Sequence, residues 1–263
     1  MNVLIIGDAV GSSGCEFLRA HLPAIKRRKS IDIVIVNGEN SADGNGITPA
    51  SADFLLESGI DVITTGNHVY RRPEFHGYIN ESGYVIRPAN YPEDAPGKGH
   101  VTLDLGYTSL TVVNIMGTVF MESLDCPFRT MDKILNEINS KNIIVDIHAE
   151  ATSEKKGLGF YLDGRVSAVV GTHTHVQTSD EQLLPKGTAY ITDIGMTGPR
   201  ISVLGIEPSL AISKMKGKLP VRFAAAAPPC EINGVVIEID HSSGRAKSIE
   251  RILIRDSADS ISP

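Results

Sequence analysis

The sequence lacks the features of a membrane or secreted protein. It has no uninterrupted apolar run near the roughly 18 residues that a membrane-spanning helix needs, and 41% of its residues are hydrophobic and 21% charged. The first residues, MNVLIIGD, have no basic start and reach Asp8 after a few apolar positions, which indicates a core strand rather than a signal peptide. We therefore expect a protein of the cytoplasm that has no membrane partner.

Paired cysteines and excess positive charge are also missing. Cys15, Cys126 and Cys230 are an odd number at wide spacing without a CxxC pair, so they are expected to be free thiols rather than zinc ligands or a redox centre. The formal net charge of −6 excludes the general electrostatic footprint of a protein that coats nucleic acid. A small anionic ligand is still compatible with this charge if metal ions supply positive charge locally.

Short apolar runs rich in β-branched residues recur along the chain and predict buried strands. Early in the chain they alternate with helix-like segments at 15–28, 49–58 and 73–82, an order that predicts parallel strands joined by crossovers. Later strands follow one another closely, and 230–240 with 248–254 predicts a hairpin, which indicates a second, mixed sheet. The predicted strands cover residues 3–6, 33–36, 60–65, 101–105, 110–115, 143–147, 167–170, 188–191 and 235–239.

Ligand-capable side chains follow five of these strands. They are Gly7-Asp8, Asn37-Gly38-Glu39-Asn40, Gly66-Asn67-His68, His148, and Gly171-Thr172-His173-Thr174-His175. Each has an ordinary structural explanation when taken alone: Asp8 as a helix cap, Gly66-Asn67 as a turn, His148 as a half-buried core histidine. Since sites in open α/β sheets assemble at the carboxyl ends of strands, the recurrence favours convergence on one site.

The chemistry of this set indicates a metal centre. His173 and His175 are separated by one residue, so in an extended segment both imidazoles would point into one cavity. Imidazoles, carboxylates and carboxamides without a thiolate suit iron, manganese or zinc rather than calcium. A carboxylate can bridge two ions, and a pair of metals about 3.5 to 4 Å apart activates water and neutralises a phosphoryl transition state. The residues therefore predict that the protein hydrolyses a phosphoester.

In this order and spacing, the five motifs resemble the calcineurin-like metallophosphoesterase superfamily, and more closely its bacterial YmdB-type phosphodiesterase branch. The resemblance extends over nearly the whole chain and includes runs at 114–117 and 192–196. Three departures from the wider superfamily are shared with that branch. The segment Asp8-Ala9-Val10 lacks the histidine of the usual Asp-x-His motif. Glu39 replaces a bridging aspartate, and Val69 replaces an acid after Gly-Asn-His.

The resemblance implies a four-layer α/β/β/α sandwich with two mixed β-sheets, formed by a single metallophosphoesterase domain over residues 1–263. It also implies two divalent or trivalent transition-metal ions per chain, iron or alternatively manganese, and no organic cofactor. One ion would be held by Asp8, Glu39 and His175 with Asn40 at or beside it, and the other by Glu39, Asn67, His148 and His173.

The implied substrates are small phosphodiesters, above all 2',3'- or 3',5'-cyclic nucleotides. A metal-activated hydroxide would attack phosphorus in line, and His68 would stabilise the transition state or protonate the leaving oxygen, because an imidazole titrates near neutrality. Asp193 is interpreted either as an outer-shell residue or as a structural Asx turn. Specificity is expected in the loops 87–99 and 117–126, and the chain is expected to form a homo-oligomer.

Competing classes fit the residues less well. A serine hydrolase of the Gly-Asp-Ser type would lack its nucleophile, because Ala9 follows Asp8. Gly7, Gly11 and Gly14 form neither a GxGxxG fingerprint nor a P-loop. Two alternatives stay open: a regulatory or scaffolding metalloprotein with little turnover, and a phosphomonoesterase.

Overall fold

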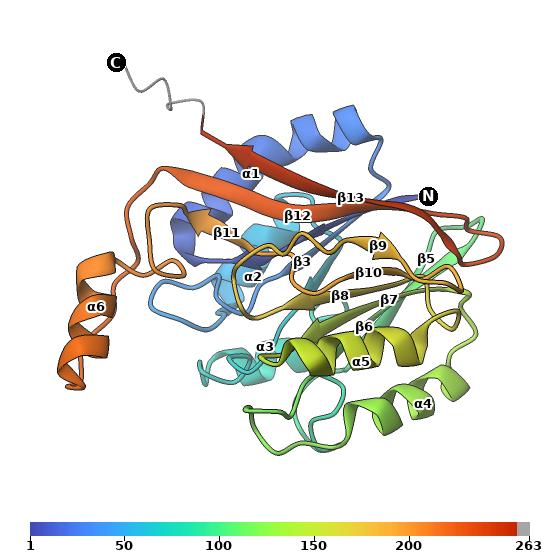
Figure 1. The fold of residues 1–263 in the computed structure, drawn as a ribbon, viewed down its shortest axis with the longest axis horizontal. Coiled ribbons are helices and arrows are strands. Elements are labelled where there is room, and N and C mark those ends of the chain that lie inside the picture. Colours follow the sequence, from blue (N-terminus) through green and yellow to red (C-terminus); the bar gives the residue numbers. More distant parts are fainter. Residues whose placement is uncertain (257–263) are drawn as a thin grey trace.

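Two mixed β-sheets lie at the centre of the chain, and the computed structural model describes residues 1–256 (Figure 1). In the first sheet the strands follow the order β2-β11-β12-β1-β3-β4, and β13 pairs with β12. The pairs β1–β3 and β3–β4 are parallel, whereas β12 is antiparallel to β1, β11 and β13. These strands are β1 (Asn2–Ile6), β2 (Asp8–Ala9), β3 (Ile33–Asn37), β4 (Val62–Thr64), β11 (Met196–Pro199), β12 (Cys230–Ile239) and β13 (Ala246–Arg255).

The second sheet has the order β5-β6-β7-β8-β10-β9. Its four central strands are parallel, and β5 and β9 pair antiparallel at the two edges. The strands are β5 (His100–Asp104), β6 (Ser109–Met116), β7 (Asn142–His148), β8 (Ala168–Thr172), β9 (Gln182–Leu183) and β10 (Ala189–Ile191). Both sheets therefore present the carboxyl ends of parallel strands at one edge.

The two sheets pack face to face, as the alternation within β1 shows. Val3 and Ile5 point into the core between the sheets, where they meet Ile144 of β7. Leu4 and Ile6 point the other way, toward the helices. A strand covered on both faces is apolar at every position, which explains the continuous hydrophobic runs of the sequence.

Helices cover the outer face of each sheet and complete the four layers (Figure 1). The buried side chains of α1, α2 and α3 join the cluster behind the first sheet, and those of α4 and α5 join the cluster behind the second. The predicted four-layer α/β/β/α sandwich with two mixed β-sheets is confirmed. The helices are α1 (Gly11–Lys29), α2 (Pro49–Glu57), α3 (Phe75–Glu81), α4 (Pro127–Glu137), α5 (Thr152–Leu162) and α6 (Pro208–Gly217).

Several predicted boundaries differ from the structure by a few residues. The segment 60–65 contains only the three residues of β4, and the helix predicted from residue 15 begins at Gly11. Its first turn is rich in glycine and serine, which are poor helix formers, but Gly11 N donates to the Asn40 carbonyl at 2.9 Å. Ser12 N donates to Asp43 Oδ1 at 2.9 Å, so tertiary contacts fix this turn.

The hairpin predicted near the end of the chain is confirmed, since β12 and β13 pair antiparallel. Within residues 1–256, the helices are all too short or too polar to cross a bilayer.

Candidate metal centre

The carboxyl ends of the two sheets face each other, and Asn37 joins them. Asn37 is buried at the end of β3, and its Nδ2 lies 3.4 Å from Thr172 Oγ1 of β8 and 3.3 Å from Asp146 Oδ2 of β7. Side chains that follow strands of either sheet therefore meet in one place, which is the convergence expected from their positions in the sequence.

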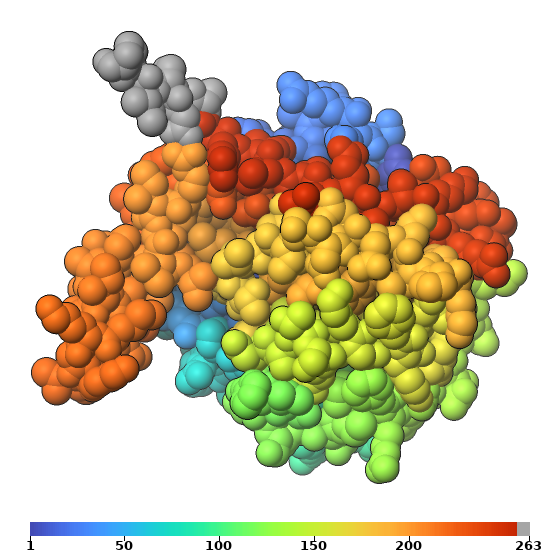
Figure 2. All heavy atoms as spheres, viewed as in Figure 1, coloured from blue at the N-terminus to red at the C-terminus, as the bar shows by residue number. Residues whose placement is uncertain are grey.

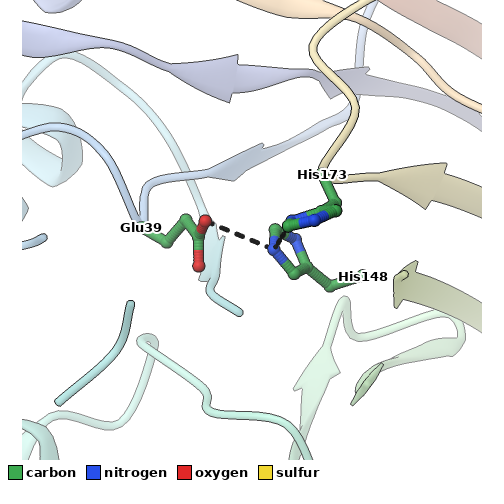
Figure 3. Close-up of side chains that lie close together, drawn as sticks. All are labelled: Glu39, His148 and His173. Atoms are coloured by element: carbon green, nitrogen blue, oxygen red, sulfur yellow. Dashed lines mark hydrogen bonds and ion pairs between the residues drawn. The ribbon is translucent and has the colours of Figure 1, made fainter. Parts of the chain in front are cut away.

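The first group of converging side chains surrounds His148. Its Nε2 lies 3.2 Å from Glu39 Oε1, 3.0 Å from Asn67 Oδ1 and 3.0 Å from His173 Nδ1. Figure 3 shows Glu39, His148 and His173 pointing toward one another, and one ligand atom of each lies within 4.8 Å of the others. His148 and Glu39 are fully buried, whereas Asn67 and His173 are partly exposed, so this group lies between the interior and the solvent.

A second group lies on the other side of Glu39. His175 Nε2 is 3.6 Å from Asp8 Oδ1 and 3.4 Å from Asn40 Nδ2. Asn40 Nδ2 also donates to Glu39 Oε1 at 3.1 Å. Glu39 is thus the carboxylate shared by the two groups, in the position that a bridging ligand would occupy.

His68 lies at the edge of this site. Its Nδ1 is 2.9 Å from Asn40 Oδ1 and 3.3 Å from Glu39 Oε1, and its backbone N–H donates to Glu39 Oε2 at 3.0 Å. The ring is partly exposed, whereas Glu39 is buried. His68 therefore stands between the buried groups and the solvent.

The donor atoms fit transition-metal ions. Asp8 and Glu39 are buried carboxylates whose ion-pair partners within residues 1–256 are histidines. In the same part of the chain, Asp8 Oδ1 and His175 Nδ1 are buried without a hydrogen-bond partner. A buried charge is strongly unfavourable unless it is paired or coordinates a metal. Carboxylate oxygens, imidazole nitrogens and amide oxygens are suitable ligands for transition-metal ions.

The pKa values of His148 and Glu39 also indicate that the site favours positive charge. Burial acts to lower the pKa of His148, but the charge and hydrogen bond of Glu39, together with the charges of Asp8 and Asp146, outweigh burial and raise that pKa to about 9. Burial likewise opposes ionisation of Glu39, yet His148 and His68 hold the pKa of Glu39 well below its usual range. A carboxylate that draws a proton onto a buried imidazole would equally attract a metal cation.

The backbone at three positions is adapted to this crowding. A Cβ atom on Gly66 would lie 2.3 Å from His148 Nε2 and 2.5 Å from Glu39 Oε2, so only glycine fits there. His173 and His175 have φ angles of 99° and 64°, in the left-handed region that side chains rarely adopt. The prediction that both lie in an extended segment is wrong: a bend directs His173 to the first group and His175 to the second.

Asp146 is linked to His148 through a hydrogen-bonded threonine. This residue was not predicted from the sequence as part of the site. His148 Nδ1 lies 2.9 Å from Thr172 Oγ1, which donates to Asp146 Oδ1 at 2.8 Å, while Thr64 donates to the other carboxylate oxygen. Burial raises the pKa of Asp146 to about 6. The signal was an acid inside the apolar run IIVDIH, two residues before His148.

Asp193 forms the predicted Asx turn and also contacts the loop between the two histidines. Its Oδ1 accepts from Gly195 N at 2.9 Å, as in an Asx turn. Its Oδ2 accepts from Thr174 N at 3.0 Å, from Thr174 Oγ1 at 2.7 Å and from Lys155 Nζ at 2.8 Å. Asp193 thereby fixes the residue between His173 and His175.

Comparisons with known proteins agree with this architecture. Residues 4–252 match the family model described as YmdB-like protein. The chain is 46% identical over 258 residues to the 2',3'-cyclic-nucleotide 2'-phosphodiesterase of Bacillus subtilis (strain 168), a match that covers 97% of this chain and 98% of that protein.

Two crystal structures have closely similar folds. A hypothetical protein from Thermus thermophilus has a TM-score of 0.92 and 42% identity, over 97% of this chain and 99% of that one. A novel phosphatase from Mycoplasma pneumoniae has a TM-score of 0.92 and 31% identity, over 97% of this chain and 93% of that one. The resemblance inferred from the motifs is confirmed, and the chain belongs to the YmdB-like protein family of metallophosphoesterase-type enzymes.

Proposed function

We propose that this protein is a dinuclear metal-dependent phosphodiesterase that hydrolyses small phosphodiesters, with cyclic nucleotides as the first substrates to test. The observation that carries the proposal is the convergence of donor atoms from both sheets around Glu39, where neighbouring donor atoms lie 3.0 to 3.4 Å from one another. The Bacillus subtilis relative, whose name specifies 2',3'-cyclic nucleotides, favours these over the 3',5' isomers.

The proposed ligand set divides at Glu39. One ion would be held by Asp8, Asn40 and His175, the other by Asn67, His148 and His173, and Glu39 would bridge them. When bound, iron or manganese ions supply the positive charge that activates water and stabilises the phosphoryl oxygens in the transition state. Asn67 contributes a neutral oxygen, so the ligands offset less of that positive charge than a third carboxylate would.

His68 is the proposed proton donor to the leaving oxygen. The Asn40 carboxamide oxygen accepts from Nδ1–H, which fixes the ring orientation and assigns the exchangeable proton of the imidazolium to Nε2. Because the ring borders on solvent, a substrate that enters the site meets His68 before it meets Glu39. His68 would also hydrogen-bond the developing negative charge on the ester oxygen.

Removal of His68 tests this role. We expect His68→Ala to keep its metal ions and lose about 10²- to 10⁴-fold in turnover, the usual contribution of a general acid. Bound metal is measured by elemental analysis, and turnover with 2',3'-cyclic AMP and bis(p-nitrophenyl) phosphate. His241→Ala, which changes an exposed histidine near the amino end of β7, is the control. Unchanged turnover of His68→Ala would reject the assignment.

Removal of the two carboxylates tests the metal centre itself. Asp8→Asn combined with Glu39→Gln keeps the size of the side chains but removes both buried negative charges. We expect this variant to lose bound metal as well as activity. Full metal content in the variant would contradict the proposed ligand set.

A phosphomonoesterase is the second candidate, because the Mycoplasma pneumoniae relative is described as a phosphatase. Parallel assays with p-nitrophenyl phosphate and a cyclic nucleotide separate the two activities. A fully metallated protein that turns over neither substrate would instead favour a regulatory or scaffolding metalloprotein.

We also propose that residues 1–263 form a single metallophosphoesterase domain that works in the cytoplasm as a homo-oligomer. Glu39 follows a strand of the first sheet and His148 ends a strand of the second, so neither half of the chain holds the site alone. This division of the ligands supports a single domain.

A further inference from the structure

Glu150 is an acidic residue that lies beside the proposed ligands. It follows His148 by two residues, in the segment between β7 and α5, and α5 lies on the surface of the molecule (Figure 2). Ala149 N donates to the Thr172 carbonyl at 3.4 Å, which joins this segment to the end of β8. His173 comes directly after β8. The backbone therefore holds Glu150 close to His173.

The two ring nitrogens of His173 face different groups. Nδ1 lies 3.0 Å from His148 Nε2, inside the candidate metal centre (Figure 3). Nε2 lies 3.1 Å from Glu150 Oε2, which belongs to a side chain that is 53% exposed. The two nitrogens of an imidazole point away from each other, so a cation at Nδ1 is remote from a carboxylate at Nε2. In this arrangement Glu150 is a partner of His173 rather than a further metal ligand.

His148 shows what such a partner does. Thr172 Oγ1 has one hydrogen, which it donates to Asp146 Oδ1 at 2.8 Å. The same oxygen lies 2.9 Å from His148 Nδ1 and therefore accepts from Nδ1–H, which leaves the lone pair of Nε2 for a cation. All three of these side chains are buried. His173 is instead partly exposed, and its partner lies on the solvent side.

We propose that Glu150 is a positioning residue of the metal centre, which accepts a hydrogen bond from His173 Nε2–H and keeps the Nδ1 lone pair directed into the site. A carboxylate acceptor fixes the tautomer and orientation of a ligating histidine and makes its other nitrogen more basic. An exposed negative charge beside the site repels an anionic substrate, and the support of His173 accounts for a carboxylate there. The inference rests on the ligand set proposed above.

The affinity for cobalt(II) provides the first test, measured by competition with a chelator. We expect Glu150→Ala to bind one of the two ions about 10- to 100-fold more weakly than the unmodified protein. Glu150→Gln should lose less, because its amide oxygen still accepts a hydrogen bond, although a neutral acceptor makes a weaker one. Glu81→Ala changes an exposed glutamate at the end of α3 and is the matched control, which should bind both ions normally.

Two results of this titration would overturn the proposal. Equal affinities of Glu150→Ala and the unmodified protein would show that the contact with His173 is an exposed ion pair without effect on the site. Equal losses in Glu150→Ala and Glu150→Gln would show that the negative charge acts on the ions directly, without the hydrogen bond.

The N–H protons of the ligating histidines give an independent readout. In the cobalt(II) protein the paramagnetic ion shifts their NMR signals away from the others, and each signal is seen only while its proton exchanges slowly with water. We expect one signal to broaden in Glu150→Ala, that of His173 Nε2–H. The signal of His148 Nδ1–H should persist, because its acceptor Thr172 is buried. A spectrum unchanged in Glu150→Ala would contradict the hydrogen bond.

Turnover separates positioning from a direct action on substrate. With 2',3'-cyclic AMP, excess cobalt(II) should restore most of the turnover of Glu150→Ala, because the variant lacks metal affinity rather than a reacting group. A deficit that persists in the fully loaded variant would assign Glu150 to the substrate and overturn the proposal. An unmodified protein that binds no cobalt(II) would overturn the ligand set and this inference together, whereas normal binding by Glu150→Ala would overturn this inference alone.

Discussion

Lys155 and Asp193 form a buried ion pair next to the loop that carries His173 and His175. The loss of unfolding free energy on removing this pair can be estimated from its burial. The Lys155 Nζ to Asp193 Oδ2 distance is 2.8 Å and both side chains are fully buried. Lys155→Met keeps an unbranched apolar stem but leaves the Asp193 charge uncompensated. Removing one partner of a buried pair costs about 3 to 5 kcal/mol, a large part of the roughly 5 to 15 kcal/mol by which proteins resist unfolding.

The assay is urea unfolding of the metal-free protein in a chelator, so that loss of metal does not add to the measured change. Thermal unfolding should follow, because about 2 to 4 °C per kcal/mol in a protein of this size gives a decrease in Tm of about 6 to 20 °C. Lys155→Met combined with Asp193→Asn should be less destabilised than Lys155→Met alone, since no unpaired charge remains.

The neighbouring lysine is the control. Lys156 lies on the same helix and pairs with Asp180 at 3.1 Å, but the two side chains are 42% and 28% exposed. An exposed pair contributes about 0 to 1 kcal/mol, so Lys156→Met should have little effect. Equal destabilisation by the two lysine variants would refute the reasoning that burial sets the cost.

Three further changes test the support of the site and of the fold. Gly66→Ala should lose bound metal, because its Cβ would lie 2.3 Å from His148 Nε2. Gly77→Ala is the control and should keep its metal, because its Cβ would meet none of the described atoms within 4 Å. Equal metal content of the two variants in elemental analysis would contradict this prediction. Asp146→Asn removes the charged acceptor beneath His148 and should weaken metal binding by about 10- to 100-fold, as measured by chelator competition, and an unchanged affinity would exclude a supporting role. Burial acts to raise the pKa of Asp180, but hydrogen bonds from Thr192, Thr178 and Lys156 together lower it to about 2. The stability that Asp180 contributes is therefore present above the unfolded pKa of 3.8 and lost as the pH falls toward 2, and the urea midpoint of Asp180→Asn should vary less with pH in that range.

Much of the fold was predictable because buried parallel strands are continuous apolar runs. The helix α5, which the sequence did not predict, depends on a contact between distant residues. The helix α5 contains Gly157 and Gly159, which disfavour a helix when judged from the sequence. A Cβ on Gly159 would lie 2.5 Å from the ring of Tyr190, so the glycine is required by packing against a strand that is distant in the sequence. Local propensity and tertiary packing oppose each other at this position.

The groups that meet at the site were predictable from their places at strand ends, whereas their support was not. Lys155 lies in the polar run SEKKG, which has the composition of a solvated helix face. Its burial depends on the pairing with Asp193, 38 residues later, which leaves no local signal. The opposite directions of His173 and His175 depend on positive φ angles at both residues, and sequence alternation carries no information about such a bend.

The position of Glu39 connects the metal centre to the packing of the two sheets. Glu39 follows β3 of the first sheet, while His148 and His173 belong to β7 and to the loop after β8 in the second. Ions held between these residues would link the sheets at their carboxyl edges, next to the contact that Asn37 makes with Thr172. Folding also brings together two buried carboxylates, those of Asp8 and Glu39. This arrangement is unfavourable, and a bound cation would relieve it. A ligand that binds only the folded state stabilises it by mass action, so the residues proposed for catalysis would also contribute to the stability of the sandwich.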